Sequence, residues 1–178
     1  MRIIAGTLGG RQFEAPHGHR THPMSEKARG GLFNALGDIE GLTVLDAFAG
    51  TGALGFEALS RGAASVIAID TERHAAETIE RSASSLGVGT AIKVIKANAS
   101  GWSDNNPDAT FDLVLLDPPY DNIKINLLQK LTKHVRTNGG LLVLSWPGHE
   151  ETPLLDSLEE VKDQNYGDAQ LVFYRRNQ

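Results

Sequence analysis

Five short apolar runs alternate with helical segments along this chain of 178 residues, and this alternation is the strongest constraint on its fold. The predicted strands lie near residues 43–48, 65–69, 91–97, 111–116 and 140–146. The predicted helices lie near residues 53–61, 72–86 and 123–135. Strands that alternate with helices form a parallel sheet covered by helices on both faces. The sequence therefore predicts an α/β protein.

Three further segments complete the predicted order of elements. Residues 2–15 resemble a hairpin of two short strands around Gly9 and Gly10, and residues 25–36 form a helix between Ser25 as N-cap and Gly37. Residues 103–110 are polar and are predicted to be a loop. We expect one domain, with residues 1–40 as an amino-terminal extension of a body at 41–178.

A glycine-rich loop follows the first predicted strand of the body. Gly50, Gly52 and Gly55 form a GxGxxG pattern between a strand and a helix, and Asp70 lies twenty residues after Gly50. Dinucleotide-binding enzymes share this spacing, so an NAD-dependent oxidoreductase is one interpretation. Asp46 lies four residues before the first glycine, where a carboxylate suits an ammonium better than a pyrophosphate. S-adenosylmethionine has such an ammonium and no phosphate.

An Asp-Pro-Pro-Tyr sequence, Asp117 to Tyr120, ends the apolar run at 111–116. Proline fixes φ and has no N–H, so nearby carbonyl groups stay free for a ligand. The Asp117 carboxylate and the Pro118 carbonyl can accept the two N–H bonds of a planar amine, while Tyr120 stacks on its ring system. This arrangement would hold the amine nitrogen against a methyl donor and stabilise its developing positive charge.

These motifs together resemble a known family. The matching segments are RIIAG at 2–6, DAFAGTGALGFEAL at 46–59, DPPY at 117–120 and residues 23–36. They resemble the RsmD-type methyltransferases, which modify the N2 amine of a guanine in 16S ribosomal RNA. The match at 23–36 is imperfect, since His22, Met24 and Gly30 depart from the family pattern.

The resemblance implies a Rossmann-like class I methyltransferase fold, with a mostly parallel seven-stranded sheet whose last strand, at 169–175, is an antiparallel edge strand. It implies S-adenosylmethionine as the cofactor. The residues expected to bind this cofactor are Asp46, Phe48, Ala49, Gly50, Thr51, Gly52, Asp70, Asn98 and Ala99. The residues expected at the catalytic site are Asp117, Pro118, Pro119 and Tyr120. For Asn98, which would meet the adenine edge, the alternative is a residue that merely ends a strand.

The charge distribution suggests an RNA partner, although the net charge of the chain is −5. Residues 1–31 carry five basic and two acidic side chains, which gives +3 and leaves −8 for the remainder. A basic extension on an acidic body indicates local contact with RNA phosphates. The predicted RNA-binding residues are Arg2, Arg11, Arg20 and Arg29. An ordinary solvated surface of mixed charge is the alternative.

Composition bounds the location and the metal chemistry. There are no cysteines, which excludes disulfides and thiolate metal sites. The histidines at 17, 19 and 22 have no carboxylate or cysteine partners nearby, so we expect no metal. The first ten residues are too short an apolar stretch for a signal peptide, and no run is long enough to span a membrane. We expect a cytoplasmic monomer that acts on small-subunit ribosomal RNA or on the assembling small subunit.

Other functions fit parts of this pattern. An adenine-N6 methyltransferase of DNA or RNA, or a protein glutamine-N5 methyltransferase, would use the same acceptor tetrapeptide. A non-catalytic RNA-binding module would leave that tetrapeptide without a role, and an NAD-dependent oxidoreductase would leave it unexplained. The choice of guanine N2 over adenine N6 depends on the family resemblance alone.

Overall fold

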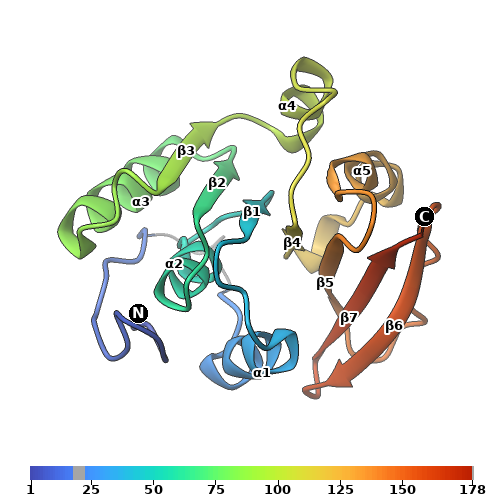
Figure 1. Ribbon diagram of the computed structural model, residues 1–178, viewed down its shortest axis with the longest axis horizontal. Helices are drawn as coiled ribbons and strands as arrows, with labels where there is room; N and C mark the ends of the chain where they lie inside the picture. Colours follow the sequence, from blue (N-terminus) through green and yellow to red (C-terminus); the bar gives the residue numbers. More distant parts are fainter. Residues whose placement is uncertain (18–22, 178) are drawn as a thin grey trace.

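The computed structural model describes residues 1–17 and 23–177, and within them the strands form one seven-stranded sheet (Figure 1). The strands are β1 Thr43–Asp46, β2 Ser65–Asp70, β3 Ile92–Lys96, β4 Leu113–Leu116, β5 Leu141–Pro147, β6 Leu158–Asn165 and β7 Ala169–Arg176. Their order across the sheet is β3-β2-β1-β4-β5-β7-β6. The predicted mostly parallel α/β sheet is confirmed, since β1 to β5 pair in parallel.

The last strand is antiparallel, as predicted, but its predicted place at the edge of the sheet is wrong. β7 lies between β5 and β6 and pairs antiparallel with both. The edge strand is β6, which the sequence pattern did not reveal. Most of its side chains are exposed, so it has neither an apolar run nor the alternation of a half-buried strand.

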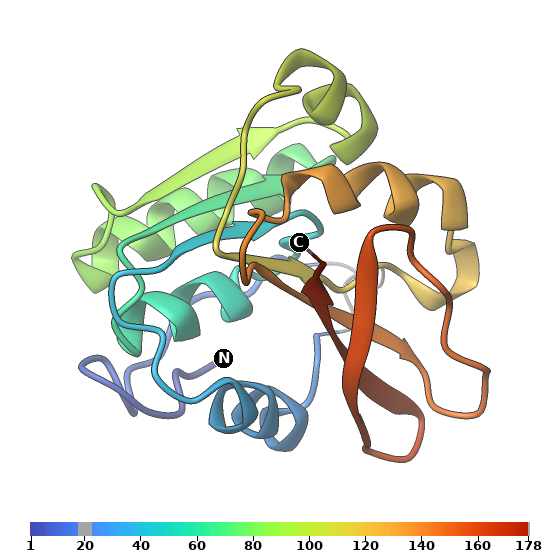
Figure 2. The ribbon, with the colours of Figure 1, turned by 45° about the vertical axis from the view of Figure 1, so that its right-hand side comes forward.

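Helices cover both faces of the sheet, as can be followed in Figures 1 and 2. They are α1 Glu26–Leu36, α2 Ala53–Ser60, α3 Arg73–Leu86, α4 Ala99–Asn105 and α5 Ile125–Leu131, with short 3₁₀ turns η1 Tyr120–Asn122 and η2 Thr132–His134. One hydrophobic cluster joins α1, α2 and α3 to the sheet. A second cluster joins α4 and α5 to it. None of the described helices is both long and apolar enough to cross a membrane.

The helix α4 corrects the prediction of a loop at 103–110, because it continues to Asn105. Asn98 caps its first turn by accepting a hydrogen bond from the Gly101 amide at 2.6 Å. Ala99 and Trp102 bury one side of this helix against the second cluster. A short helix with two apolar residues lacks the repeated spacing that a sequence pattern needs.

The predicted amino-terminal hairpin is present as a short one, with an antiparallel bridge between Arg2 and Gln12. The Ile3 amide donates to the Arg11 carbonyl at 2.9 Å, and the Phe13 amide donates to the Met1 carbonyl at 3.0 Å. The backbone amides of Ile4 and Ala5 donate to the Glu57 carboxylate in α2, at 2.9 and 3.1 Å. The Leu8 amide donates to the Ser60 hydroxyl at 2.9 Å. These bonds attach the hairpin to α2.

The helix of the extension, α1, begins and ends close to its predicted limits. The Ser25 hydroxyl accepts from the Ala28 amide at 3.1 Å, and Gly37 follows the last residue of α1 with φ of 72°. The helix buries Leu32 and Phe33 in the first hydrophobic cluster.

The strand order has a topological switch point between β1 and β4. These two strands are neighbours, and the chain continues from them in opposite directions across the sheet. Open α/β sheets bind ligands at the carboxyl ends of the strands at such a switch point. Asp46 ends β1, and Asp117 follows directly after β4.

Candidate active site

Asp46 is a buried carboxylate without a hydrogen-bond partner among the described residues. Its side chain is 0% exposed, and neither oxygen meets a donor in hydrogen-bonding geometry. Burial, followed by the neighbouring charges of Asp117 and Asp70, raises the pKa of Asp46 to about 8. The Phe48 amide points toward the carboxylate and lowers this pKa in part, although it does not form a hydrogen bond of full geometry. Buried carboxylates are normally paired. This one is arranged to meet a cation from a ligand.

The glycine loop beside Asp46 is held in a conformation that suits glycine. Gly50 and Gly52 have φ of 53° and 83°. A Cβ on Gly52 would lie 2.9 Å from the Phe56 ring, so the loop packs directly on α2. A Cβ on Gly55 would lie 3.2 Å from Val66, which is the close helix–strand approach expected of the third glycine.

Asp70 fastens this loop from the end of β2. Its carboxylate accepts from the Gly50 amide at 2.7 Å and from the Glu72 amide at 2.9 Å. Burial raises the pKa of Asp70, and these backbone donors oppose that rise. Each carboxylate oxygen retains a further lone pair, so the half-buried Asp70 can also accept from a ligand hydroxyl.

The other predicted cofactor residues surround this loop. Phe48 is half-buried, Ala49 and Thr51 are buried, and the Ala49 amide donates to the Ile69 carbonyl at 2.9 Å. Thr51 uses its hydroxyl to accept from the Ala53 amide at 3.2 Å at the start of α2. These three side chains shape the loop, and among them Phe48 offers a partly exposed ring to a ligand.

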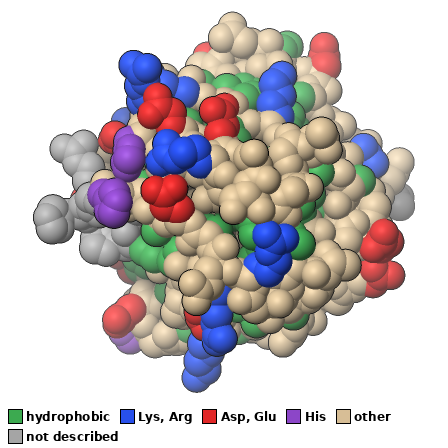
Figure 3. Space-filling model, turned by 90° about the vertical axis from the view of Figure 1, so that its left-hand side faces the viewer, with side chains coloured by type: hydrophobic (Ala, Val, Ile, Leu, Met, Phe, Trp, Pro, Cys, Tyr) green, Lys and Arg blue, Asp and Glu red, His purple; other side chains and the backbone are tan. Residues whose placement is uncertain are grey.

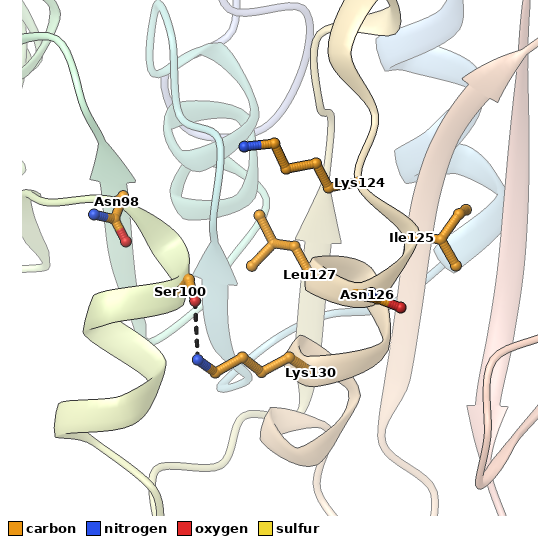
Figure 4. Close-up of a pocket in the computed structure, with 7 residues that line it drawn as sticks. All are labelled: Asn98, Ser100, Lys124, Ile125, Asn126, Leu127 and Lys130. Atoms are coloured by element: carbon orange, nitrogen blue, oxygen red, sulfur yellow. Dashed lines mark hydrogen bonds between the residues drawn. The ribbon is translucent and has the colours of Figure 1, made fainter.

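Asn98 lies on the rim of a cavity of about 760 Å³ between α4 and α5 (Figure 4). Its side-chain oxygen caps α4, which leaves the amide nitrogen free to donate. Ala99 beside it is buried. Across the cavity Lys130 donates to the Ser100 hydroxyl at 2.9 Å, and Lys124 extends from the segment before α5. Asn98 caps a helix, which the sequence did not predict, and its amide nitrogen can still contact a ligand.

The acceptor tetrapeptide has one buried and one open end. Asp117 is half-buried and Pro118 is buried, whereas Pro119 and Tyr120 are exposed, with Tyr120 at 40%. The Tyr120 hydroxyl lies 2.6 Å from the Ser145 hydroxyl in β5. Burial raises the pKa of Asp117 to about 6, and a hydrogen bond from Ser145 lowers it in part. The ring face of Tyr120 is therefore accessible above an enclosed carboxylate.

Two polar residues of this region were missed by the sequence analysis. Ser145 is 4% exposed inside the apolar strand β5, and Glu57 is 0% exposed inside the apolar helix α2. A single polar residue in an otherwise buried run is the signal that could have revealed both, because buried polar groups need partners.

The predicted RNA-binding arginines fall into different environments. Arg2 is exposed and pairs with Glu26 at 3.0 Å, and Arg11 donates to the Ser85 and Leu86 carbonyls at the end of α3, at 2.9 and 3.2 Å. Arg20 lies outside the described residues. Arg29 is 1% exposed, and its guanidinium lies 3.4 Å from the Glu57 carboxylate.

The burial of Arg29 contradicts its predicted contact with RNA. Its guanidinium also donates to the Arg2 carbonyl, so the side chain joins α1, α2 and the first residues of the extension. Arg29 therefore holds the extension against α2. On the face shown in Figure 3, basic and acidic side chains are intermixed and do not gather in one basic patch.

The histidines of the extension show no metal site where they are described. His17 stacks on His74 with ring centroids 6.2 Å apart, and His19 and His22 lie outside the described residues. Within 1–17 and 23–177, no three metal-binding side chains gather.

Comparison with known proteins identifies the family. The family model described as "Conserved hypothetical protein 95" matches residues 1–175. "Ribosomal RNA small subunit methyltransferase D" of Escherichia coli strain K12 is 33% identical over 142 residues, covering 79% of this chain and 69% of the relative. The chain belongs to the RsmD-type methyltransferase family.

Two further relatives extend this match along the whole chain. "Putative rRNA methyltransferase YlbH" of Bacillus subtilis strain 168 is 29% identical over 182 residues, covering 99% of both chains. The solved structure "Putative methyltransferase yhhF from Escherichia coli" superposes with a TM-score of 0.88 at 26% identity, covering 99% of this chain and 98% of the other. The predicted family, Rossmann-like fold and methyltransferase class are confirmed.

The site residues of this family member fit S-adenosylmethionine. The unpartnered Asp46 carboxylate suits the ammonium of the methionine part. The glycine loop, held by Asp70, leaves an approach without side chains. A buried carboxylate beside the glycine loop would repel a pyrophosphate and attract an ammonium. The site therefore suits a sulfonium cofactor with an ammonium better than a dinucleotide with a pyrophosphate.

Proposed function

We propose that this chain transfers the methyl group of S-adenosylmethionine to the exocyclic N2 amine of a guanine in small-subunit ribosomal RNA. The observation that carries the proposal is the meeting of two carboxylates, Asp46 and Asp117, at the switch point between β1 and β4. One is enclosed and lacks a partner, and the other begins the acceptor tetrapeptide. The relatives named as ribosomal RNA methyltransferases support the choice of substrate.

On the cofactor side, two carboxylates and one amide would bind different parts of the ligand. Asp46 would accept from the ammonium and Asp70 from the ribose hydroxyls, while the amide nitrogen of Asn98 would donate to the adenine edge. When bound, the cofactor supplies an electrophilic methyl group on a sulfonium. Charge-assisted hydrogen bonds contribute about 1.5–3 kcal/mol each, so Asp46 and Asp70 are the main polar determinants of affinity.

On the acceptor side, the amine nitrogen is held by Asp117 and Pro118. An exocyclic amine is a poor nucleophile because its lone pair is delocalised into the ring. With both N–H bonds accepted by the carboxylate and the carbonyl, the nitrogen can become tetrahedral toward the methyl group. The positive charge that develops there is stabilised by the fixed carboxylate. The methylated nitrogen then loses one N–H proton to the Asp117 carboxylate and from there to solvent, which leaves the neutral N-methyl amine.

The target base must leave its stack to reach this site. Its ring would lie on the exposed face of Tyr120, and stacking of this kind contributes about 1–3 kcal/mol. A base in a loop of folded ribosomal RNA needs less unstacking than a base in a duplex.

For the RNA backbone, we keep Arg2, Arg11 and Arg20 as proposed contacts and leave out Arg29. Arg2 exposes 60% of its side chain beside Glu26, so a phosphate can compete for it. Reversal of Arg2 to Glu should weaken RNA binding and flatten its salt dependence, because phosphate contacts release counterions. A monomer in the cytoplasm, acting on ribosomal RNA or on the assembling subunit, goes with this proposal.

Nucleoside mass spectrometry tests the proposed product. Small-subunit RNA from a deletion strain and from a complemented strain should differ by one N2-methylguanosine. Loss of N6-methyladenosine would overturn the guanine assignment in favour of an adenine enzyme. No difference in any ribosomal nucleoside, with modification of a protein glutamine, would favour the glutamine-N5 alternative.

A matched pair of variants tests the acceptor site. Asp117→Ala should lose methyl transfer by about 10²–10³-fold, the range for loss of one preorganised electrostatic group, and should retain cofactor affinity. Asp121→Ala is the control, since Asp121 is an exposed carboxylate in the same segment. Equal rates for the two variants would remove Asp117 from the mechanism.

A further inference from the structure

Ser145 is a polar residue in a position built for an apolar one. It lies in β5 between the buried residues Leu144 and Trp146, and it is 4% exposed. Leu144 pairs with Leu116 across the β4–β5 ladder, so Ser145 lies beside Asp117, the next residue along. Burial of a hydroxyl is unfavourable unless it is hydrogen-bonded. The partners of Ser145 therefore explain why it is there.

Both partners of Ser145 belong to the acceptor tetrapeptide. Its hydroxyl lies 2.6 Å from the Tyr120 hydroxyl. The β4–β5 register also places Ser145 beside Asp117, where a hydrogen bond from its hydroxyl lowers the pKa of that carboxylate. A serine or tyrosine hydroxyl has one proton to donate, and an ionised carboxylate has none. The Ser145 proton must then go to Asp117, and the Tyr120 proton must go to Ser145. The result is a directed chain from Tyr120 through Ser145 to Asp117.

We propose that Ser145 is a positioning residue of the acceptor site, which fixes the Tyr120 ring and the Asp117 carboxylate in one arrangement through this hydrogen-bond chain. The inference rests on the proposed function, because it concerns the site that would hold the acceptor amine. Ser145 itself makes no contact with the reacting nitrogen. It sets the orientation of the two groups that do.

The hydrogen-bond chain has a different effect on Tyr120 than on Asp117. Tyr120 is 40% exposed, so its ring would change rotamer freely without a bond at its hydroxyl. Asp117 must be ionised to accept its N–H bond from the amine and to stabilise the positive charge that develops on the nitrogen. Burial raises the pKa of Asp117, and the hydrogen bond from Ser145 lowers it. The titratable groups that interact with the Asp117 charge are Asp46 and Tyr120. Loss of the Ser145 hydroxyl should loosen the ring and favour the protonated carboxyl.

The test compares Ser145→Ala with Ser145→Thr, which keeps a hydroxyl and suits a β-strand. The first readout is the pKa of the Asp117 carboxyl, measured by carbon-13 NMR in the protein without RNA. Ser145→Ala should raise it above the wild-type value, and Ser145→Thr should restore it. The second readout is methyl transfer, where Ser145→Ala should lower kcat about tenfold or more at pH 7 and shift the acidic limb of the pH profile upward. Cofactor affinity should not change.

Several outcomes would overturn the inference. An unchanged Asp117 pKa in a folded Ser145→Ala protein would show that the serine only fills space. Additive effects of Ser145→Ala and Tyr120→Phe in the double variant would show that the two hydroxyls act separately. If wild-type protein transfers no methyl group to small-subunit RNA, the proposed function fails, and the NMR comparison still decides the role of Ser145.

Discussion

The Glu57 carboxylate in α2 accepts a hydrogen bond from the backbone amide of Ile4 at 2.9 Å. The same carboxylate accepts from the Ala5 amide, pairs with Arg61 at 2.9 Å and lies 3.4 Å from Arg29. One fully buried acid thus gathers the first residues of the extension, α1 and α2. Since α2 begins at the glycine loop, the extension and the cofactor side of the site share one support.

Glu57→Ala should lower the free energy of unfolding by about 3–5 kcal/mol, because it leaves the buried Arg29 charge without compensation. Glu77→Ala is the control, since Glu77 pairs with Arg73 on the surface of α3, where such pairs contribute about 0–1 kcal/mol. Urea unfolding measures both. Similar losses in the two variants would contradict the central role of Glu57.

Gly6→Ala should release the extension from α2. A Cβ on Gly6 would lie 2.0 Å from the Ser60 carbonyl oxygen, and the residue has φ of 87°. Gly10→Ala separates the two causes, because Gly10 has φ of 84° and no atom within 4 Å of the added carbon. Gly10→Ala should cost about 1–2 kcal/mol from backbone strain alone, and Gly6→Ala clearly more. Hydrogen exchange at the Ile4 and Leu8 amides should be faster only in Gly6→Ala.

The ligand-free protein should lose stability as the pH rises from about 4 to about 8. The pKa of Asp46 is about 8 in the folded protein and about 4 in an unfolded chain, so the folded state binds more protons across this window. The stability that protonated Asp46 contributes is fully present below pH 4 and disappears as the pH passes 8. The share of the slope that comes from Asp46 is at most about 1.4 kcal/mol per pH unit. Asp46→Asn should flatten it, and an unchanged slope in that variant would contradict the assignment.

Binding of S-adenosylmethionine should release a proton near pH 7. The ammonium of the cofactor favours the ionised form of Asp46, whose pKa of about 8 keeps it mostly protonated in the free protein. Affinity should therefore increase from pH 6 to pH 8. Calorimetry in two buffers of different ionisation enthalpy measures the released proton. The same release from Asp46→Asn would point to another group.

The parts of the site that the sequence predicted lie where local pattern decides position. Asp46 and Asp117 end apolar runs, and the carboxyl ends of parallel strands share one edge of a sheet, so their meeting follows from the pattern. The order of the strands across the sheet could not be predicted in this way. Ser145 reaches Tyr120 because β5 lies next to β4, and no spacing within either strand contains that information.

Charge is the weakest guide to position. Arg29 resembles any other cation of the basic extension until Glu57 is known to lie beside it in space. Likewise, β6 carries charges on both sides and resembles a loop until β7 is seen to pair with it. Long-range partners decide both cases, and a single sequence does not reveal them.

The two outer strands of the sheet have a consequence for association between molecules. β3 exposes Lys93 and Lys96, while β6 exposes Glu159, Glu160, Lys162 and Asp163 and has an irregular register between Glu160 and Lys162. An open strand edge offers free backbone groups to a neighbouring molecule, and charged side chains and bulges obstruct that pairing. The charged side chains that hid β6 from sequence prediction therefore also disfavour edge-to-edge pairing of this sheet with a second molecule.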